Sequence, residues 1–358
     1  MAKKDEAPEP QPLPSPRLLP WHSAAIAQLR QAWTANRLPH AILLQGAEGL
    51  GKGSFTAWLA AAVLCEKSVD GKLDVCGACT SCALIKAGSH PDLHWIAPEE
   101  DKQSLSVDQV RAACEKLSKT SFRQGYKVAI LEPAHQMTPG AANSVLKTLE
   151  EPSRGSLLVL ITSRPSGLLP TVRSRCQKLS IARPSTADAM AWLQQESGKT
   201  VSPALLEFSG GAPLRALAYA DGRFEGLNQS MQKALKDLLS GDADVTQVAA
   251  EWEKDALIDR LVWLDLWLCS LARTGIAGTA ERVTFPGGPA HLPSPSRPLN
   301  ISALYSMVDR TRALKAQLAR TALQRELAVE SWLIALLEVL ASSPAGSSRG
   351  GAPVARAS

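Results

Sequence analysis

A short apolar strand that leads directly into a glycine-rich loop constrains the fold of this chain most. Residues 41–44 are Ala-Ile-Leu-Leu, and residues 46–52 are Gly-Ala-Glu-Gly-Leu-Gly-Lys. The G-x-x-x-x-G-K spacing is typical of a loop whose backbone N–H groups converge on nucleotide phosphates, beside the positive end of the next helix. Short glycine patterns also recur by chance, but the preceding strand and the helix that we expect at 54–64 favour a phosphate loop.

Further apolar runs predict that this strand belongs to a parallel sheet. Helices are expected to open at Ser106, where Gln109 completes a capping box, and at Thr138, where Pro139 occupies the first turn. The runs between the helices are apolar throughout rather than alternating, which indicates strands covered on both faces. We expect these strands at 93–97, 128–131 and 157–161, and a further, last strand at 177–181.

Strand patterns end at about residue 182, and helical patterns follow, interrupted by a Gly- and Pro-rich stretch at 275–298. A chain of 358 residues is too long for one ordinary domain. Both ends are rich in Pro and in small or charged residues, which is typical of disorder. We predict a disordered segment at 1–17, an α/β domain at 18–182, a small helical domain at 183–222, an all-helical domain at 223–341 and a disordered tail at 342–358.

The composition narrows the class of protein. The apolar runs are shorter than a membrane span, and the N-terminus lacks the apolar core of a signal peptide. Seven cysteines, an odd number, in a chain without an export signal favour a reducing compartment, so we expect a cytoplasmic protein with no membrane contact. The net charge of +5 permits nucleic-acid contact but does not indicate a dedicated DNA-binding protein.

The phosphate loop lacks side chains that ATP hydrolysis needs. Residue 53 is Gly where Ser or Thr would hold magnesium, and Ser54 lies about 100° further around the helix. The strand at 127–131 ends in Glu132-Pro133 instead of an acidic pair, and losing a general base typically costs about 10²–10⁴ in rate. We predict negligible hydrolysis. Nucleotide binding without tight magnesium, and no binding at all, both stay open. Use of Glu132 in a shifted register is disfavoured, because the strand pattern fixes its position.

A cluster of cysteines predicts a structural metal site. Two successive C-x₂-C spacings follow a cysteine at the end of the first predicted helix, and four thiolates satisfy the tetrahedral geometry of zinc. A redox pair is a weaker alternative, since four thiols suit a closed structural site better. The predicted Zn²⁺ ligands are Cys65, Cys76, Cys79 and Cys82. The isolated Cys114, Cys176 and Cys269 are expected to be buried free thiols.

An arginine in Ser174-Arg175-Cys176 is placed in a loop before the last predicted strand. An arginine donated to a neighbouring ATP site stabilises charge on the transferred phosphoryl group and is worth about 10³–10⁵ in rate. The alternative is a surface or domain-packing arginine, and Arg173 is a competing candidate for an ion pair. The motif alone does not choose between these roles.

Several motifs together resemble one family. Beside the phosphate loop, the cysteine module at 65–82 and Ser174–Gln177, the chain has Ser-His-Pro-Asp at 89–92 and Asn-Ser-Val-Leu-Lys-Thr-Leu-Glu-Glu-Pro at 143–152. This set resembles the bacterial DNA polymerase III clamp-loader subunits of the AAA+ superfamily. The resemblance is rich over residues 20–182, thinner to about 222 and only architectural beyond.

The resemblance implies an AAA+ parallel-sheet domain, a helical lid domain and an α-helical collar domain. In this family the γ/τ motor subunits have an intact phosphate loop and an Asp-Glu pair, whereas δ′ subunits present the Ser-Arg-Cys arginine to an adjacent γ subunit. Gly53 and Pro133 make the chain similar to δ′, with Arg175 as the donated arginine. The implied nucleotide-binding set, vestigial in δ′, is Gly46, Gly49, Gly51, Lys52, Thr162 at the sensor-1 position and Arg215 at the sensor-2 position.

The implied partners are γ/τ and δ subunits in a heteropentameric ring, which opens the β sliding clamp and loads it on primed DNA. The chain would then be part of a DNA-directed DNA polymerase, a nucleotidyltransferase holoenzyme, without ATPase activity of its own. Two alternatives stay open. The chain is an ATP-hydrolysing γ/τ-like motor that uses Glu132, or it is a zinc-bearing DNA-binding protein on an AAA+ frame. The zinc module is expected to be a rigid knuckle, with a partner or nucleic-acid contact as the second interpretation.

Overall fold

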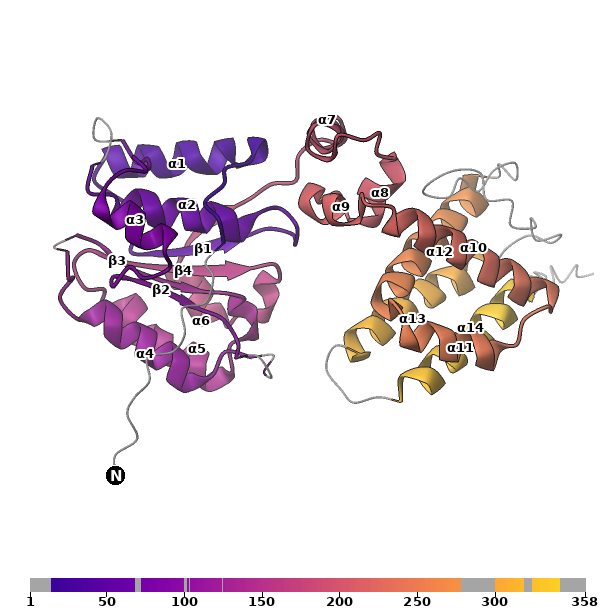
Figure 1. The fold of residues 1–358 in the computed structure, drawn as a ribbon. Helices are drawn as coiled ribbons and strands as arrows, with labels where there is room; N and C mark the ends of the chain where they lie inside the picture. The colour runs from indigo at the N-terminus through magenta and orange to yellow at the C-terminus, as the bar shows by residue number, and fades with distance from the viewer. Residues whose placement is uncertain are drawn as a thin grey trace, which may run out of the picture. The chain divides into compact units, whose positions relative to one another are not determined.

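The computed structural model describes residues 14–67, 72–99, 102, 104–123, 125–277, 300–318 and 324–341. Residues 1–13 of the predicted N-terminal segment, the predicted tail at 342–358 and most of the Gly- and Pro-rich stretch lie outside these residues. The chain divides into two compact units (Figure 1). The first contains residues 1–189 and 212–215, and the second contains 190–211 and 216–358.

A five-stranded parallel sheet forms the centre of the first unit, in the order β2-β3-β4-β1-β5. The three middle strands are almost entirely buried, as their continuous apolar sequences predict. The sheet predicted from the apolar runs is therefore confirmed. Its strands are β1 (Ala41–Gln45), β2 (Leu93–Ile96), β3 (Lys127–Leu131), β4 (Ser156–Thr162) and β5 (Gln177–Ser180).

Each face of the sheet is covered by helices, with a separate apolar core on each side (Figure 1). Successive residues of β1 alternate between the cores, since Ile42 and Leu44 belong to one and Leu43 to the other. Helices α1 (Ser23–Thr34) and α2 (Lys52–Leu64) contribute to the first core. The second core includes residues of α4 (Val107–Ser118), α5 (Pro139–Glu150) and α6 (Pro170–Arg175).

Side-chain capping explains which helix starts could be predicted from the sequence. Helix α4 begins with the predicted capping box, in which Ser106 Oγ accepts from Gln109 N at 3.3 Å and Gln109 Oε1 accepts from Ser106 N at 3.0 Å. Thr138 Oγ1 accepts from Ala141 N at the start of α5. Helix α1 was not predicted: its N-cap residue is His22, whose side chain makes no capping hydrogen bond, so the usual start signal is missing.

In the described residues of the second unit, every element of regular secondary structure is a helix. Its interior contains Trp263, whose Nε1 donates to Asn228 Oδ1 at 2.9 Å, and Trp332, whose Nε1 donates to Thr311 Oγ1 at 3.1 Å. None of the helices in the described part of the chain is long and apolar enough to cross a membrane. The helices after β5 are α7 (Thr186–Ser197), α8 (Pro203–Phe208), α9 (Pro213–Tyr219), α10 (Arg223–Ser240), α11 (Val245–Lys254), α12 (Leu257–Ala277), α13 (Ile301–Leu318) and α14 (Arg325–Ala341).

Candidate functional site

The phosphate loop joins the carboxyl end of β1 to the start of α2, as predicted. Gly49 and Gly51 have φ angles of 75° and 77°, a left-handed conformation that favours glycine. A Cβ atom at Gly49 would lie 2.8 Å from Cβ of Arg215, and one at Gly51 would lie 2.6 Å from Cδ1 of Leu19. Both positions therefore need glycine for packing as well as for backbone conformation.

The structure gathers the predicted nucleotide-binding set around this loop. Leu214 N donates to Gly49 O at 3.1 Å and so holds the neighbouring Arg215 against the loop. Gly46 N donates to the carbonyl of Thr162 at 3.3 Å, at the end of the adjacent strand β4. Residues far apart in sequence are thus brought together at the carboxyl ends of the strands.

Lys52 lies at the centre of this set and is buried, with 8% of its surface exposed. Its Nζ donates to Ala47 O at 2.7 Å, within the same loop. Burial lowers the pKa of Lys52, and the nearby carboxylates of Glu48 and Glu132 act in the opposite direction. The loop therefore contains a desolvated amine flanked by two carboxylates.

Glu132 faces the position where a magnesium-binding hydroxyl would stand. A Cβ atom at Gly53 would lie 3.6 and 3.7 Å from the two Glu132 carboxylate oxygens, which is ordinary contact. Burial raises the pKa of Glu132, opposed by the charge of Lys52 and by a hydrogen bond from Trp95. The next residue is Pro133, which has no acidic side chain. The site thus has a carboxylate at this position but neither the hydroxyl nor the second acid.

Thr162 has a partner that sequence reasoning missed. Its Oγ1 lies 3.1 Å from Nδ1 of His135 and accepts from Arg164 N at 3.0 Å. Burial lowers the pKa of His135, and Arg164 lowers it further. His135 lies in the short 3₁₀ helix η3 (Ala134–Gln136), and its contact with Thr162 spans 27 residues of sequence, so no local pattern announces it.

The N-terminal segment also holds the phosphate loop, through a carbonyl group. Trp21 Nε1 donates to Leu50 O at 3.0 Å, and His22 Nε2 lies 2.8 Å from the same oxygen. Leu19 N lies 3.2 Å from His22 Nδ1 and donates to it, so Nε2 carries the proton and donates to Leu50 O. Burial lowers the pKa of His22, which keeps the ring neutral in this role.

Arg175 lies at the end of a short helix, not in the loop that the sequence predicted. Pro170 occupies the first turn of α6 and fits there because its missing N–H is not needed. Arg175 Nη2 lies 2.8 Å from Glu150 Oε1, and Nη1 donates to Thr171 O at 3.1 Å. Neither partner belongs to the phosphate loop. The Arg175 side chain is 39% exposed.

The four predicted metal ligands converge around the start of α3 (Thr80–Lys86). Cys65 follows the last residue of α2, and Cys79 is the N-cap residue of α3. The sulfur atoms of Cys65, Cys76, Cys79 and Cys82 all lie within 4.8 Å of one another. The predicted clustering of these cysteines is therefore confirmed, and the group can hold a metal ion.

The chemistry of the sulfur atoms fits a cation. Cys76 N donates to Cys65 Sγ at 3.5 Å, and Cys82 N donates to Cys79 Sγ at 3.4 Å, as expected for sulfurs that carry negative charge. Burial opposes ionisation of Cys79, but backbone N–H donors such as Cys82 N bring its pKa to about 6. Burial and the neighbouring thiol of Cys79 raise the pKa of Cys82 to about 12. A bound cation would favour the thiolate at every position.

A chain of hydrogen bonds connects the cysteine module to the sheet. Ser81 Oγ donates to Glu66 Oε1 at 2.8 Å, and His90 Nε2 lies 3.1 Å from Ser81 Oγ. Asp92 N donates to His90 Nδ1 at 3.1 Å, which leaves the proton on Nε2. His90 therefore links Ser81 of the cysteine module to Asp92, and it is not one of the four clustered metal-ligand candidates.

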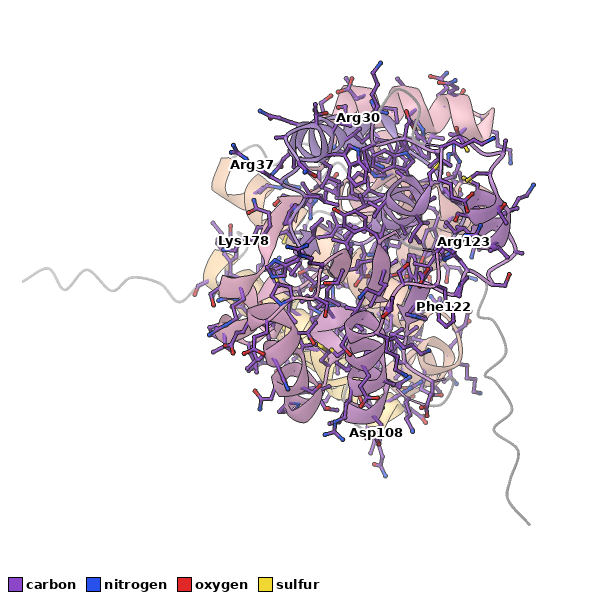
Figure 2. The ribbon with its side chains drawn as sticks, turned by 90° about the vertical axis from the view of Figure 1, so that its left-hand side faces the viewer. Arg30, Arg37, Asp108, Phe122, Arg123 and Lys178 are labelled. Atoms are coloured by element: carbon purple, nitrogen blue, oxygen red, sulfur yellow. The ribbon has the colours of Figure 1, made fainter. Side chains whose placement is uncertain are left out.

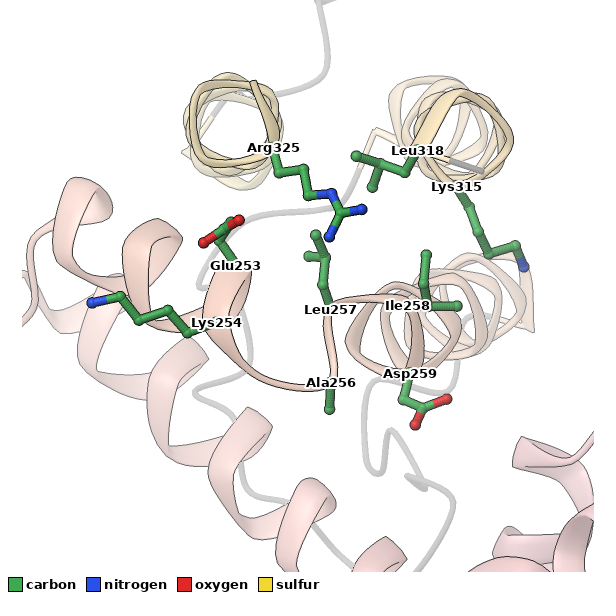
Figure 3. Close-up of a pocket in the computed structure, with 9 residues that line it drawn as sticks. All are labelled: Glu253, Lys254, Ala256, Leu257, Ile258, Asp259, Lys315, Leu318 and Arg325. Atoms are coloured by element: carbon green, nitrogen blue, oxygen red, sulfur yellow. The ribbon is translucent and has the colours of Figure 1, made fainter. Parts of the chain in front are cut away.

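A separate cavity of about 530 Å³ lies in the second unit, between the turn that joins α11 to α12 and the facing ends of α13 and α14 (Figure 3). Figure 3 shows the Arg325 guanidinium pointing into this cavity, near Leu257 and Leu318. None of the predicted site residues lines it.

The sequence is similar to one family of known proteins. A family model described as "DNA polymerase III, delta subunit" matches residues 21–185. DNA polymerase III subunit delta' of Pseudomonas aeruginosa is 35% identical over 260 residues, which cover 72% of this chain and 77% of that protein. The delta' subunit of Escherichia coli K12 is 33% identical over 324 residues, which cover 89% of this chain and 95% of that protein. A solved DNA polymerase III gamma subunit-related protein of Thermotoga maritima is 19% identical, with a TM-score of 0.41, and the match covers 88% of this chain and 99% of that one.

Proposed function

The chain belongs to the family of DNA polymerase III delta' (δ′) subunits, and on this premise we propose that it completes the ATP site of a neighbouring clamp-loader subunit without hydrolysing ATP itself. In this proposal Arg175 is the arginine donated to the neighbour. The γ/τ motor and δ subunits are the partners in a heteropentameric ring. The complex acts on the β sliding clamp and primed DNA in the cytoplasm.

The observation that carries the proposal is the chemistry of the phosphate loop. The fold of the loop is complete, but Gly53 offers no metal-binding hydroxyl and Pro133 offers no base. Losing the base alone costs about 10²–10⁴ in rate. Glu132 is the carboxylate that remains, and its burial opposes the ionised form in which it would bind a metal or accept a proton.

The setting of Arg175 supports a role outside its own subunit. The ion pair with Glu150 and the hydrogen bond to the Thr171 carbonyl hold the guanidinium at the end of α6, where it is partly exposed. A partly exposed pair of this kind contributes only about 0–1 kcal/mol, so a phosphate group of a neighbouring site competes with Glu150 at little cost. The planar fork of arginine suits two parallel hydrogen bonds to phosphate oxygens.

The cysteine module takes Zn²⁺ in this proposal. Four thiolates form a closed tetrahedral set, which leaves no open position for a substrate. The ion would thus act in folding rather than in chemistry, which fits the predicted role as a rigid knuckle.

The test is ATP turnover in a reconstituted loader whose γ/τ subunits carry Ala at their own Ser-Arg-Cys arginines. Only the site that faces this chain can then turn over efficiently. Arg175→Ala is expected to lower that turnover by about 10³. Arg173→Ala, on the same short helix, is the control and should leave it unchanged. Unchanged turnover in Arg175→Ala, or a loss in Arg173→Ala alone, would overturn the assignment.

A further inference from the structure

A turn between α4 and β3 presents a large apolar side chain to solvent. Phe122 is 80% exposed, and Figure 2 shows it beside Arg123. Among the described residues of the first unit, the other exposed large apolar side chain is Leu18, at 36%. An aromatic side chain exposed to this degree leaves most of its apolar surface in water, so covering it with a partner would be favourable.

The turn is held rigidly from the side of the sheet. Asp92, only 3% exposed, accepts hydrogen bonds from Phe122 N at 3.0 Å, from Arg123 N at 3.2 Å and from Ser121 Oγ at 3.1 Å. Lys127 Nζ donates to the carbonyls of Leu117 and Lys119, each at 2.6 Å, and so fixes the end of α4 where the turn begins. The backbone that carries Phe122 is therefore fixed before any partner binds.

The cysteine module also contacts the turn, through an ion pair. Arg123 Nε donates to Glu66 Oε1 at 2.8 Å, and Glu66 follows the metal-binding Cys65 directly in sequence. The exposed charges next to the turn are mostly positive, because Lys119 and Lys67 accompany the Arg123–Glu66 pair. The turn thus combines a fixed apolar tip with a basic surround.

We propose that Phe122 is an anchor that inserts into an apolar pocket with an acidic rim on a partner protein of the clamp-loader assembly. An aromatic side chain on a pre-organised backbone is a favourable interface anchor, since little backbone entropy is lost on binding. The basic surround complements carboxylates at the rim of such a pocket. Single-stranded nucleic acid is disfavoured, because it stacks on a series of aromatic side chains and the described part of this unit exposes one here.

The turn lies away from the phosphate loop and at the end of the sheet where Arg175 lies, because the turn precedes the amino end of β3 and Arg175 precedes the amino end of β5. The phosphate loop follows the carboxyl end of β1, whereas the turn precedes the amino end of β3, and the strands are parallel. The phosphate loop and the turn therefore lie at opposite ends of the strands. The proposal rests on the proposed function only for the identity of the assembly.

The test compares Phe122→Ala and Phe122→Leu with the wild-type chain. Dissociation constants are measured for the purified sliding clamp, δ and γ/τ proteins and for a labelled single-stranded oligothymidylate, and clamp loading is measured with the reconstituted complex. We expect Phe122→Ala to weaken one protein contact by about 30-fold or more and to slow loading. Leu, which fills a pocket but does not stack on bases, should largely restore both. Arg37→Ala, labelled in Figure 2 away from Phe122, is the control and should match wild type.

Loss of oligothymidylate binding alone in Phe122→Ala would overturn the proposal in favour of a nucleic-acid contact. Unchanged protein affinities together with unchanged loading would overturn it outright. The thermal unfolding of Phe122→Ala should match wild type, since the side chain is exposed. The two proposals can fail separately. If Arg175→Ala lowers ATP turnover as expected but Phe122→Ala changes neither protein affinity nor clamp loading, this inference is rejected and the proposed function is retained.

Discussion

The phosphate loop and the cysteine module both collect side chains from separate elements around one point, but only the module has a complete set. All four module sulfurs lie within 4.8 Å of one another. The loop has its glycine conformations and its buried Lys52, yet it lacks the hydroxyl at residue 53 and the acid at residue 133. The cysteine module has all the side chains that a metal site needs, whereas the phosphate loop has its backbone fold but not all the side chains that ATP hydrolysis needs.

The difference separates residues that the fold needs from residues that only chemistry needs. Gly49 and Gly51 are required by crowding from Arg215 and Leu19, and Lys52 fills buried space. A hydroxyl at residue 53 is required by no packing contact, because a Cβ there meets its neighbours only at 3.5 Å and beyond. The chain therefore has a loop that supports the domain without the groups that would make it a motor.

The largest effect is expected from removing a metal ligand of the cysteine module. Cys79→Ser should remove about one equivalent of bound zinc, because it removes one of the four thiolates. Structural zinc contributes an apparent 10–16 kcal/mol to small modules. Leu73, fully buried between Cys65 and Cys76 in sequence, would lose its place in the core, so the melting temperature should fall as well. Metal analysis and thermal unfolding measure both. Cys114→Ser is the control and should retain the metal; a full zinc equivalent with unchanged unfolding in Cys79→Ser would refute this assignment.

A smaller effect is expected from adding the missing hydroxyl at the phosphate loop. Gly53→Thr should raise the affinity for magnesium-ATP over metal-free ATP by about tenfold, equivalent to one added metal contact, because the hydroxyl would stand beside Glu132. Turnover should stay at background, since Pro133 still supplies no base. Calorimetric titrations with and without magnesium test this. Gly53→Ala fills the same space without a hydroxyl, and an equal magnesium-dependent gain in that control would contradict the explanation.

The smallest expected effect is a pH dependence at the phosphate loop. Burial lowers the pKa of His22 in the folded chain, so the unfolded chain binds more protons and stability rises with pH. This contribution is intact above the unfolded pKa of about 6.5 and is lost as pH falls through the lower folded value. His22→Gln should therefore show a shallower fall in melting temperature between about pH 7 and pH 5. The burial-lowered pKa values of His90, His94 and His135 affect both proteins alike, and an equal slope would argue against the His22 contribution.

The features that could be predicted from the sequence are those that short sequence patterns determine. The three middle strands of the first unit follow from continuous apolar runs, and α4 and α5 follow from capping residues within three positions of their starts. The cysteine cluster was equally accessible, because three of its four ligands are separated by two residues each and share one turn. In each case the residues that decide the structure are neighbours in sequence.

The contacts that complete the site could not be predicted, because they depend on how distant elements pack. Leu214 N reaches the carbonyl of Gly49, and His135 reaches Thr162, across separations that no local pattern encodes. The pairing of Arg175 with Glu150 depends on α6 packing near the end of α5. The motif identified Arg175 as a candidate, but only the structure shows which groups hold it in place.

The most direct test of the proposed function is steady-state ATP hydrolysis by the purified chain alone, compared with a Lys52→Ala variant prepared in the same way. We expect equal background rates in both proteins, because the loop lacks a metal-binding hydroxyl and a base. Turnover that depends on Lys52 would contradict it. Such a result would mean that Glu132 acts as the working carboxylate and that the chain is itself a motor.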